Sequence, residues 1–397
     1  MALEIVCDSS ITSITTRQES SAQSLDISSS KPSNSSILTR IHAGYFSIAL
    51  SLAAQALLWK VLSEPKIANN ASKHERDVLS LLPHIIFLLL WWFALLAQVS
   101  LSLLYVLRCF FHFHLVKAEF LNHVAVNYLY TPWISLLLLL QAAPESVHHA
   151  FGIISFTVLY WVSAVPVLIL DVKIYGRWFT TQKRFLSIFA NPSSQISVIG
   201  NFVVTRAAAH MGWKEGAIGM FSLGMVHYMV LFITLYQHLS SSSRFPTILR
   251  PSLFLFFAAP SMGSLAWNSI TGAFDVTCKM LFFLALFLFI SLACRPVLFK
   301  KAMRKFNVAW WAYSFTTTFL ALAALRYAQE VKAEVAVVLQ LALTSLSLLV
   351  SLVLMVLTAA KVNRLLHEDD PLLNFINNSK SKTSALPKVE ETVNGQK

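Results

Sequence analysis

The chain has 397 residues, of which 56% are hydrophobic and only 13% are charged, and its mean hydropathy is +0.62. Soluble domains carry about 25% charged residues, so this composition excludes an ordinary soluble protein. Lysine and arginine outnumber the acids by 31 to 19, for a net charge of +12. Whether this excess marks a nucleic-acid partner depends on where the basic residues lie.

Both ends of the chain are polar. Residues 1–38 are rich in serine and contain no apolar run long enough for a signal peptide, so we expect a cytoplasmic tail there. Ser20 follows Arg17 at a spacing that basic-directed protein kinases accept, which makes it a phosphorylation candidate; such short matches are also frequent by chance. Residues 361–397 form a second polar tail.

Residues 39–360 contain the apolar sequence. A helix that crosses a hydrocarbon core of about 30 Å needs roughly 20 apolar residues. Ten such stretches follow one another: 41–60, 82–107, 123–142, 148–170, 193–212, 216–238, 251–268, 276–296, 306–326 and 335–360. They predict an all-α integral membrane protein. Short loops at 143–147 and 213–215 alternate with longer basic loops at 171–192 and 297–305, which favours five consecutive helical hairpins and a weak internal repeat.

The loop charges predict the orientation. Lysine and arginine accumulate in cytoplasmic loops. With the N-terminus inside, the inner loops hold thirteen basic residues and the outer loops six. The thirteen are Arg108, Lys117, Lys173, Arg177, Lys183, Arg184, Arg244, Arg250, Arg295, Lys300, Lys301, Arg304 and Lys305. We therefore expect both termini in the cytoplasm and no nucleic-acid partner.

The motifs of enzyme chemistry are missing. The sequence contains no Walker loop, dinucleotide fingerprint, HExxH or GxSxG motif, and its four cysteines are scattered without paired histidines. No carboxylate pair lies inside an apolar stretch at helical spacing. We therefore expect neither an enzyme nor a bound metal or cofactor.

Charged residues and prolines inside the stretches are candidates for a pathway through the membrane. Arg206 lies about two thirds of the way along the fifth stretch; an intramembrane arginine is costly and is a functional candidate, with snorkelling to the interface as the alternative. Pro132 and Pro260 interrupt odd-numbered stretches, where a bend is tolerated if the freed carbonyl faces a cavity or another helix. Proline is also common in membrane helices without such a role.

Phe315 and Asn70 are two further candidate residues. Phe315 lies in the ninth stretch, where packing or lipid contact is the simplest role for a phenylalanine. Asn70, in Asn-Ala-Ser, falls in a loop expected outside and is a glycosylation candidate.

Five segments resemble the plant slow-type anion channels, homologues of the guard-cell channel within the tellurite-resistance and dicarboxylate transporter superfamily. They are HAGYFSIALSLAAQALLWK (42–60), DVKIYGRWF (171–179), NPSSQISVIGNF (191–202), LFFAAPSMGSLAWNSI (255–270) and FNVAWWAYSF (306–315). The similarity extends over about 41–360. The short tails and the segment from Lys300 to Phe315 are most similar to the short-tailed branch of that family.

The resemblance implies a fold and a function. It implies ten helices in five hairpins, with the odd-numbered helices around a central pore, in a trimer with one pore per subunit. It also implies passage of chloride, nitrate or malate across the plasma membrane, and it assigns to Phe315 the role of a pore gate.

Two departures from the family pattern leave alternatives open. A proline commonly follows the gate phenylalanine, and here the residue is Thr316, so a kink that directs the ring is missing. Arg206 would place a cation along the pore. One alternative is an electrically silent subunit that modulates a conducting relative in hetero-trimers. Another is a proton-coupled dicarboxylate carrier, against which the sequence offers no intramembrane carboxylate for a proton relay.

Overall fold

The computed structural model describes residues 37–63, 73–180, 191–240, 247–300, 303 and 306–362, and all regular structure in these ranges is helical. The predicted modification sites Ser20 and Asn70 lie outside the described residues.

Five helices form a closed ring, which we call the inner ring. They are α2 (Phe46–Ser63), α6 (Thr131–Gln141), α9 (Gln195–His210), α11 (Leu255–Thr271) and α14 (Trp311–Val331). Each contacts the next in chain order, and α14 contacts α2, which closes the ring. Most of the residues in α2, α11 and α14 are buried, between 72% and 89% of each apolar window.

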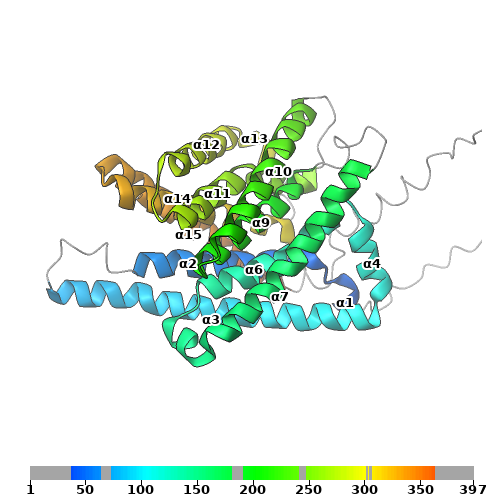
Figure 1. The fold of residues 1–397 in the computed structure, drawn as a ribbon, viewed down its shortest axis with the longest axis horizontal. Helices are drawn as coiled ribbons and strands as arrows, with labels where there is room; N and C mark the ends of the chain where they lie inside the picture. The colour runs from blue at the N-terminus through cyan, green and yellow to red at the C-terminus, as the bar shows by residue number, and fades with distance from the viewer. Residues whose placement is uncertain are drawn as a thin grey trace, which may run out of the picture. The chain divides into compact units, whose positions relative to one another are not determined.

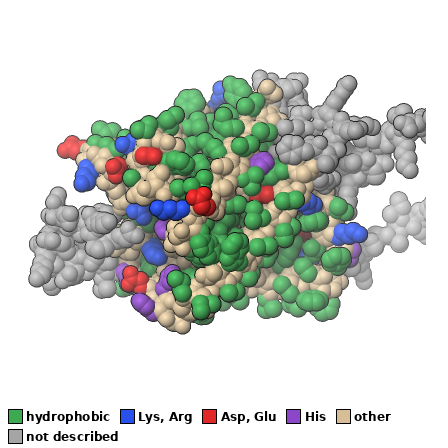
Figure 2. Space-filling model, in the orientation of Figure 1, with side chains coloured by type: hydrophobic (Ala, Val, Ile, Leu, Met, Phe, Trp, Pro, Cys, Tyr) green, Lys and Arg blue, Asp and Glu red, His purple; other side chains and the backbone are tan. Residues whose placement is uncertain are grey.

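Five other helices cover the inner ring. They are α3 (Lys73–Phe111), α7 (Glu145–Thr180), α10 (Lys214–Ser240), α12 (Val276–Ala293) and α15 (Glu334–Ala360). Each contacts the inner helix that precedes it in the chain, as α2 and α3 do side by side in Figure 1. Only 22% to 39% of their apolar windows are buried. Large side chains such as Leu89 and Phe287 are about two-thirds exposed, and Figure 2 shows hydrophobic side chains over much of the visible face.

Such exposed apolar surface would be unstable in water and is normal in lipid. Eight helices in the described residues are long and apolar enough to cross a membrane. The number becomes nine if α4 (Phe113–Leu121) and the helix over Ala125–Gln141 count as one span. The chain bends by 107° between these two helices. The sequence predicted ten. The shortfall arises because this stretch is bent and because α9 carries polar residues such as Asn201 and Arg206, which lower its hydropathy.

Short turns precede the inner helices. Four are 3-10 turns, namely η1 (Ala43–Tyr45), η3 (Pro192–Ser194), η4 (Thr247–Phe254) and η6 (Val308–Trp310), while α6 follows the one-turn helix α5 (Ala125–Tyr128). The remaining short helices are α1 (Ile37–Arg40) and α13 (Val297–Lys300).

In front of three of these turns, a side chain accepts a hydrogen bond from a backbone N–H. His42 Nδ1 accepts a hydrogen bond from the N–H of Gly44 (3.1 Å), and Asn307 Oδ1 accepts one from Ala309 (3.0 Å). Asn122 Oδ1 accepts from Val124 (2.9 Å) in front of α5. A side chain that satisfies free N–H groups fixes where a helix begins. We call this arrangement the opening turn. It is a short-range feature that recurs from one hairpin to another.

A buried polar network joins α2, α14 and α15. The Gln55 side-chain amide donates to Thr318 Oγ1 and to Ser347 Oγ, both at 2.9 Å, and the two hydroxyls are themselves 2.9 Å apart. All three side chains are at most 1% exposed. Because lipid offers no alternative partner, such hydrogen bonds hold helices together within the bilayer.

Close packing of α9 on α10 depends on Gly224. A Cβ atom at this position would lie 3.0 Å from Phe202 Cε1 and 3.1 Å from Asn201 Cβ. We expect Gly224→Val to destabilise the protein by about 1–3 kcal/mol, the usual cost of overpacking, and to lower its thermal unfolding midpoint in detergent. Gly219→Val, on the same helix with no atom within 4 Å of the new Cβ, is the control. Equal midpoints for the two variants would contradict the packing.

Candidate functional site

The predicted gate residue lies near the beginning of α14. Phe315 is 2% exposed and packs edge-on against Phe319, with ring centroids 6.0 Å apart. The neighbouring Thr316 is fully buried, and its hydroxyl donates to the carbonyl of Ala312 (2.6 Å). That bond keeps the polar group of Thr316 within its own helix, and α14 continues through this position to Val331.

The two candidate prolines occupy different places in their helices. Pro132 lies in the first turn of α6, where a missing N–H costs nothing, so the predicted helix-disturbing role was wrong for this residue. Its carbonyl accepts from the Gln98 side-chain amide of α3 at 3.0 Å. Pro260 lies inside α11, as the sequence predicted, and it is buried.

Arg206 is 6% exposed on α9, one turn before His210. His210 is exposed, and two half-buried basic residues, Lys60 of α2 and Arg326 of α14, also lie near the C-terminal ends of their helices. Arg206 therefore shares one end of the inner ring with three basic residues that the sequence did not connect to it. We call these four residues the basic cluster.

Hydrogen bonds fix the surroundings of the basic cluster. Lys60 Nζ donates to the carbonyls of Gln141 (3.1 Å) and Ala143 (2.8 Å) at the C-terminal end of α6. The Gln141 side-chain amide in turn donates to the carbonyl of Val203 on α9 (3.3 Å). A guanidinium nitrogen of Arg326 donates to Gln329 Oε1 (3.1 Å).

The basic cluster and Phe315 lie at opposite ends of the inner ring. Phe315 is in the second turn of α14, and Arg326 is eleven residues further along the same helix. At 1.5 Å per residue they are about 16 Å apart along the axis. The predicted site residues therefore form two separate places and not one cluster.

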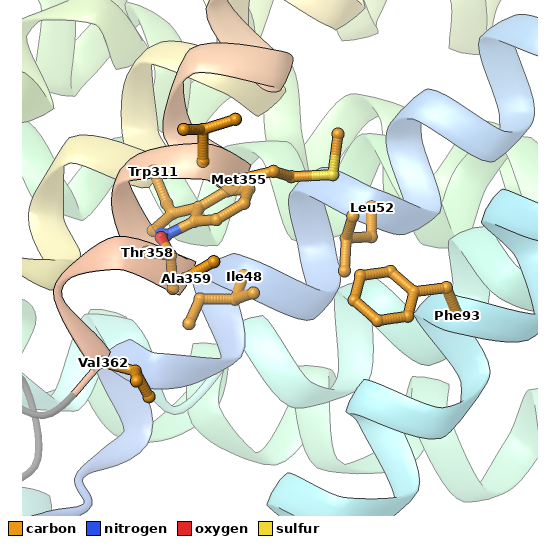
Figure 3. Close-up of a pocket in the computed structure, with 9 residues that line it drawn as sticks. Ile48, Leu52, Phe93, Trp311, Met355, Thr358, Ala359 and Val362 are labelled. Atoms are coloured by element: carbon orange, nitrogen blue, oxygen red, sulfur yellow. The ribbon is translucent and has the colours of Figure 1, made fainter.

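An apolar groove of about 520 Å³ lies outside the inner ring, between α2, α3, α14 and α15 (Figure 3). Its walls are Ile48, Leu52, Phe93, Trp311, Met355, Val356, Thr358, Ala359 and Val362. None of the predicted site residues lines it. Its polar contact is internal, since Trp311 Nε1 donates to Thr358 Oγ1 (3.2 Å).

Two buried carboxylates were missed by the sequence analysis. Asp171 of α7 is 2% exposed and accepts a hydrogen bond from the Tyr130 hydroxyl (2.8 Å). Glu119 of α4 is 4% exposed and forms an ion pair with Arg108 (2.5 Å). Arg108 itself is 1% exposed and lies in the last turn of α3, so the prediction of a loop at this residue was wrong. These helices are longer than the apolar stretches predicted from the sequence, and neighbouring helices cover the polar residues at their ends.

The chain was compared with known proteins. A family model described as voltage-dependent anion channel matches residues 40–359. The S-type anion channel SLAH1 of Arabidopsis thaliana is 56% identical over 351 residues, which cover 88% of this chain and 89% of that protein. The guard cell S-type anion channel SLAC1 of the same plant is 38% identical over 328 residues, covering 81% of this chain and 56% of that protein. The tellurite resistance protein TehA homolog of Haemophilus influenzae is 25% identical over 280 residues, covering 68% and 76%.

Proposed function

This chain belongs to the S-type anion channel family, whose members are multi-pass membrane proteins and not enzymes, and we propose that it is a plasma-membrane channel subunit that passes chloride and nitrate. The closed inner ring is the observation that carries the proposal, because a ring of helices covered by a lipid-facing layer supplies a single axis for permeation.

In this proposal the chain crosses the membrane ten times, in five hairpins. The helix over Ala125–Gln141 and the short α9 then supply two of the five inner spans, and the ring closes only if both belong to it. Of the pore-lining candidates only Arg206 is charged, so this pathway holds few ionised side chains. Such a pathway binds ions weakly, and selectivity then follows the ease with which an anion sheds water, which favours nitrate over chloride. The membrane voltage supplies about 2.3 kcal/mol per charge per 100 mV.

Phe315 closes the pathway, and opening requires its ring to swing aside. The burial of Phe315 and its place near one end of α14 support this role. Pro260, buried within α11, is the further pore-lining candidate on the inner ring, while Pro132 contacts the outer helix α3 through its carbonyl.

Assembly and orientation complete the proposal. We place both termini in the cytoplasm, on the basis of the loop charges, and the subunit in a trimer, on the basis of the family resemblance. Phosphorylation of Ser20 by a protein kinase and glycosylation of Asn70 remain predictions from the sequence.

The decisive measurement is a two-electrode recording of the full-length protein in oocytes, first in chloride and then in nitrate. We expect anion currents that are larger in nitrate, with the protein present at the cell surface. Silence of the wild type and of Phe315→Ala, alone and with a related subunit, would exclude the conducting function.

A second candidate is an electrically silent subunit that tunes a conducting relative in hetero-trimers. The burial of Arg206 on α9 favours it, because a cation along the ring can hold an anion and slow its passage. Co-purification with a conducting homologue, together with a shift in that partner's voltage or nitrate dependence, distinguishes this function from autonomous conduction.

The dicarboxylate carrier is the weakest alternative. Buried carboxylates do exist at Asp171 and Glu119, yet each is bound by a neighbour, Tyr130 and Arg108 respectively. Both therefore serve the packing of helices at the end of the ring where Phe315 lies. Saturable malate uptake driven by a pH gradient would favour the carrier over the channel.

Thr316→Pro tests the role of the missing kink. Proline removes the backbone N–H of this position and its bond within α14, which bends the helix next to Phe315. We expect a severalfold larger current than in the wild type in the same oocyte assay. Thr316→Ala, which removes only the hydroxyl and keeps the backbone bond, should leave the current unchanged. A current increase in both variants would assign the effect to the hydroxyl instead.

A further inference from the structure

The apolar groove lies where the last hairpin of the inner ring meets the first. At the other joints of the ring, an outer helix is followed in the chain by the next inner helix, whereas α14 and α2 are joined by side-chain contacts alone. The hydrogen bonds among Gln55, Thr318 and Ser347 close this joint at one level. The groove lies next to that level, towards the starts of α2 and α14, at Leu52 and Trp311.

The groove opens towards the lipid-facing side of the molecule. Its deepest residues come from inner helices, since Leu52 of α2 and Trp311 of α14 are each 1% exposed. Its rims come from two outer helices, where Phe93 of α3 and Val356 of α15 are more than half exposed. In Figure 3 the side chains of α2 lie between Phe93 and the residues of α15. The groove is therefore a recess that faces hydrocarbon.

The lining of the groove suits an apolar ligand. Among the residues that line it, only Trp311 and Thr358 carry polar side-chain groups, and these bind each other. All the others are aliphatic or aromatic. A polar ligand would lose its hydrogen bonds to water here without replacement, which is costly. At about 520 Å³, the groove has the size of a ligand site.

A cation lies at one end of the groove. Lys361, which is half-buried, directly precedes the lining residue Val362, and its ammonium lies over the ring of Phe306, 5.8 Å from the ring centre. In the proposed orientation this end is at the cytoplasmic surface of the membrane. The leaflet on that side carries anionic phospholipids, which basic residues near the surface attract. The groove thus combines an apolar recess with a positive charge at the depth of the headgroups.

We propose that the groove binds one acyl chain of an anionic phospholipid from the cytoplasmic leaflet, with the phosphate of that lipid beside Lys361. A single chain is slender enough to enter between two helices and cover Leu52 and Trp311. A helix of a second copy would rest on the exposed rims at Phe93 and Val356 and leave the recess behind them empty. An empty recess forfeits the contacts that a chain supplies.

The inference rests on the proposed function for the orientation of the chain and for its consequence. Trp311 lies one turn before Phe315 on α14, and its carbonyl accepts a hydrogen bond from the Ser51 hydroxyl of α2 (3.1 Å). A chain packed on Trp311 restrains the first turn of α14, which precedes Phe315. The anionic-lipid content of the cytoplasmic leaflet thereby influences opening.

The test is lipid binding to the purified full-length protein in detergent, measured by native mass spectrometry. The delipidated protein is titrated with dioleoylphosphatidylglycerol or with dioleoylphosphatidylcholine. We expect saturable retention of one phosphatidylglycerol per subunit and severalfold weaker retention of phosphatidylcholine. Ala359→Phe places a ring in the groove and should weaken phosphatidylglycerol binding at least tenfold. Lys361→Gln should weaken it about fivefold and leave phosphatidylcholine binding unchanged.

Two matched controls accompany these variants. Ala360→Phe adds the same ring at the next position of α15, which is exposed like Ala359 but is not among the residues that line the groove. Lys300→Gln removes an exposed basic residue of α13, which is also expected on the cytoplasmic side. Both should bind phosphatidylglycerol like the wild type. Because Ala359 is exposed on its helix, we expect its variant to fold.

Three results would overturn the inference. They are the absence of saturable phosphatidylglycerol retention in the wild type, equal losses in Ala359→Phe and Ala360→Phe, and a changed oligomeric mass in Ala359→Phe with unchanged lipid binding. The last result would assign the groove to a contact between copies. A protein that conducts in oocytes without retaining the lipid refutes the lipid site and keeps the channel. One that retains the lipid and never conducts does the reverse.

Discussion

Phe315→Ala is expected to raise the anion current at least tenfold above that of the wild type at equal surface expression. The ring of Phe315 is buried near one end of the inner ring, and alanine removes all of its atoms beyond Cβ. If this ring blocks the axis, its removal leaves an open path that no longer depends on the movement of α14. Two-electrode recordings in chloride and nitrate, with surface protein measured in parallel, give the result.

Phe319→Ala is the control for this variant. Phe319 is fully buried one turn further along α14 and contacts Phe315 directly, so the substitution removes the same volume from the same helix. We expect a less stable protein without a larger current. Equal currents from the two variants would show that loosened packing, and not loss of a gate, had opened the path.

Glu119→Ala is expected to lower the stability of the folded protein by about 3–5 kcal/mol, the cost of leaving one partner of a buried ion pair alone. Glu119 also accepts hydrogen bonds from the Tyr105 hydroxyl (3.3 Å) and from the backbone of Ala43 (3.4 Å). It therefore joins α3 and α4 to the opening turn of α2. The expected readout is a lower melting midpoint in detergent and a smaller monodisperse fraction in size-exclusion chromatography.

Two further variants test whether the loss of stability comes from the unpaired charge of Arg108 or from the removal of a side chain. Lys117→Ala, an exposed basic residue on the same helix, should melt like the wild type. The double variant Arg108→Met with Glu119→Leu removes both charges together and should recover much of the loss, because no unpaired charge is left buried. Equal destabilisation by the single and double variants would mean that the pair contributes through its hydrogen bonds to Tyr105 and Ala43.

Hydropathy alone predicted a helix in each of the ten stretches, since lipid imposes a length and an apolar surface on every span. It predicted the lipid-facing helices best. It also predicted α9 within 193–212, although polar residues such as Asn201 and Arg206 are buried there. It failed for Pro132, because the sequence does not show where α6 begins.

The sequence predicted individual residues of the candidate site but not which residues lie near one another. Arg206 stands out because a charged side chain is costly in a membrane. Phe315 stands out because the family resemblance assigns it a role. Lys60 and Arg326 do not, because each lies at a helix end where a basic residue is ordinary. Their position at one end of the ring depends on its closure, in which α14 contacts α2.

The repeated opening turn has an electrostatic consequence for the whole ring. Because every hairpin starts its inner helix at the same end, five helix N-termini point to the mouth where Phe315 lies. Each carries a partial positive charge of about half an elementary charge from its peptide dipoles. The helix N-termini thus attract anions to that mouth independently of ionised side chains. The opposite mouth receives five negative C-termini, and Lys60, bound to the carbonyls of Gln141 and Ala143, offsets part of that field.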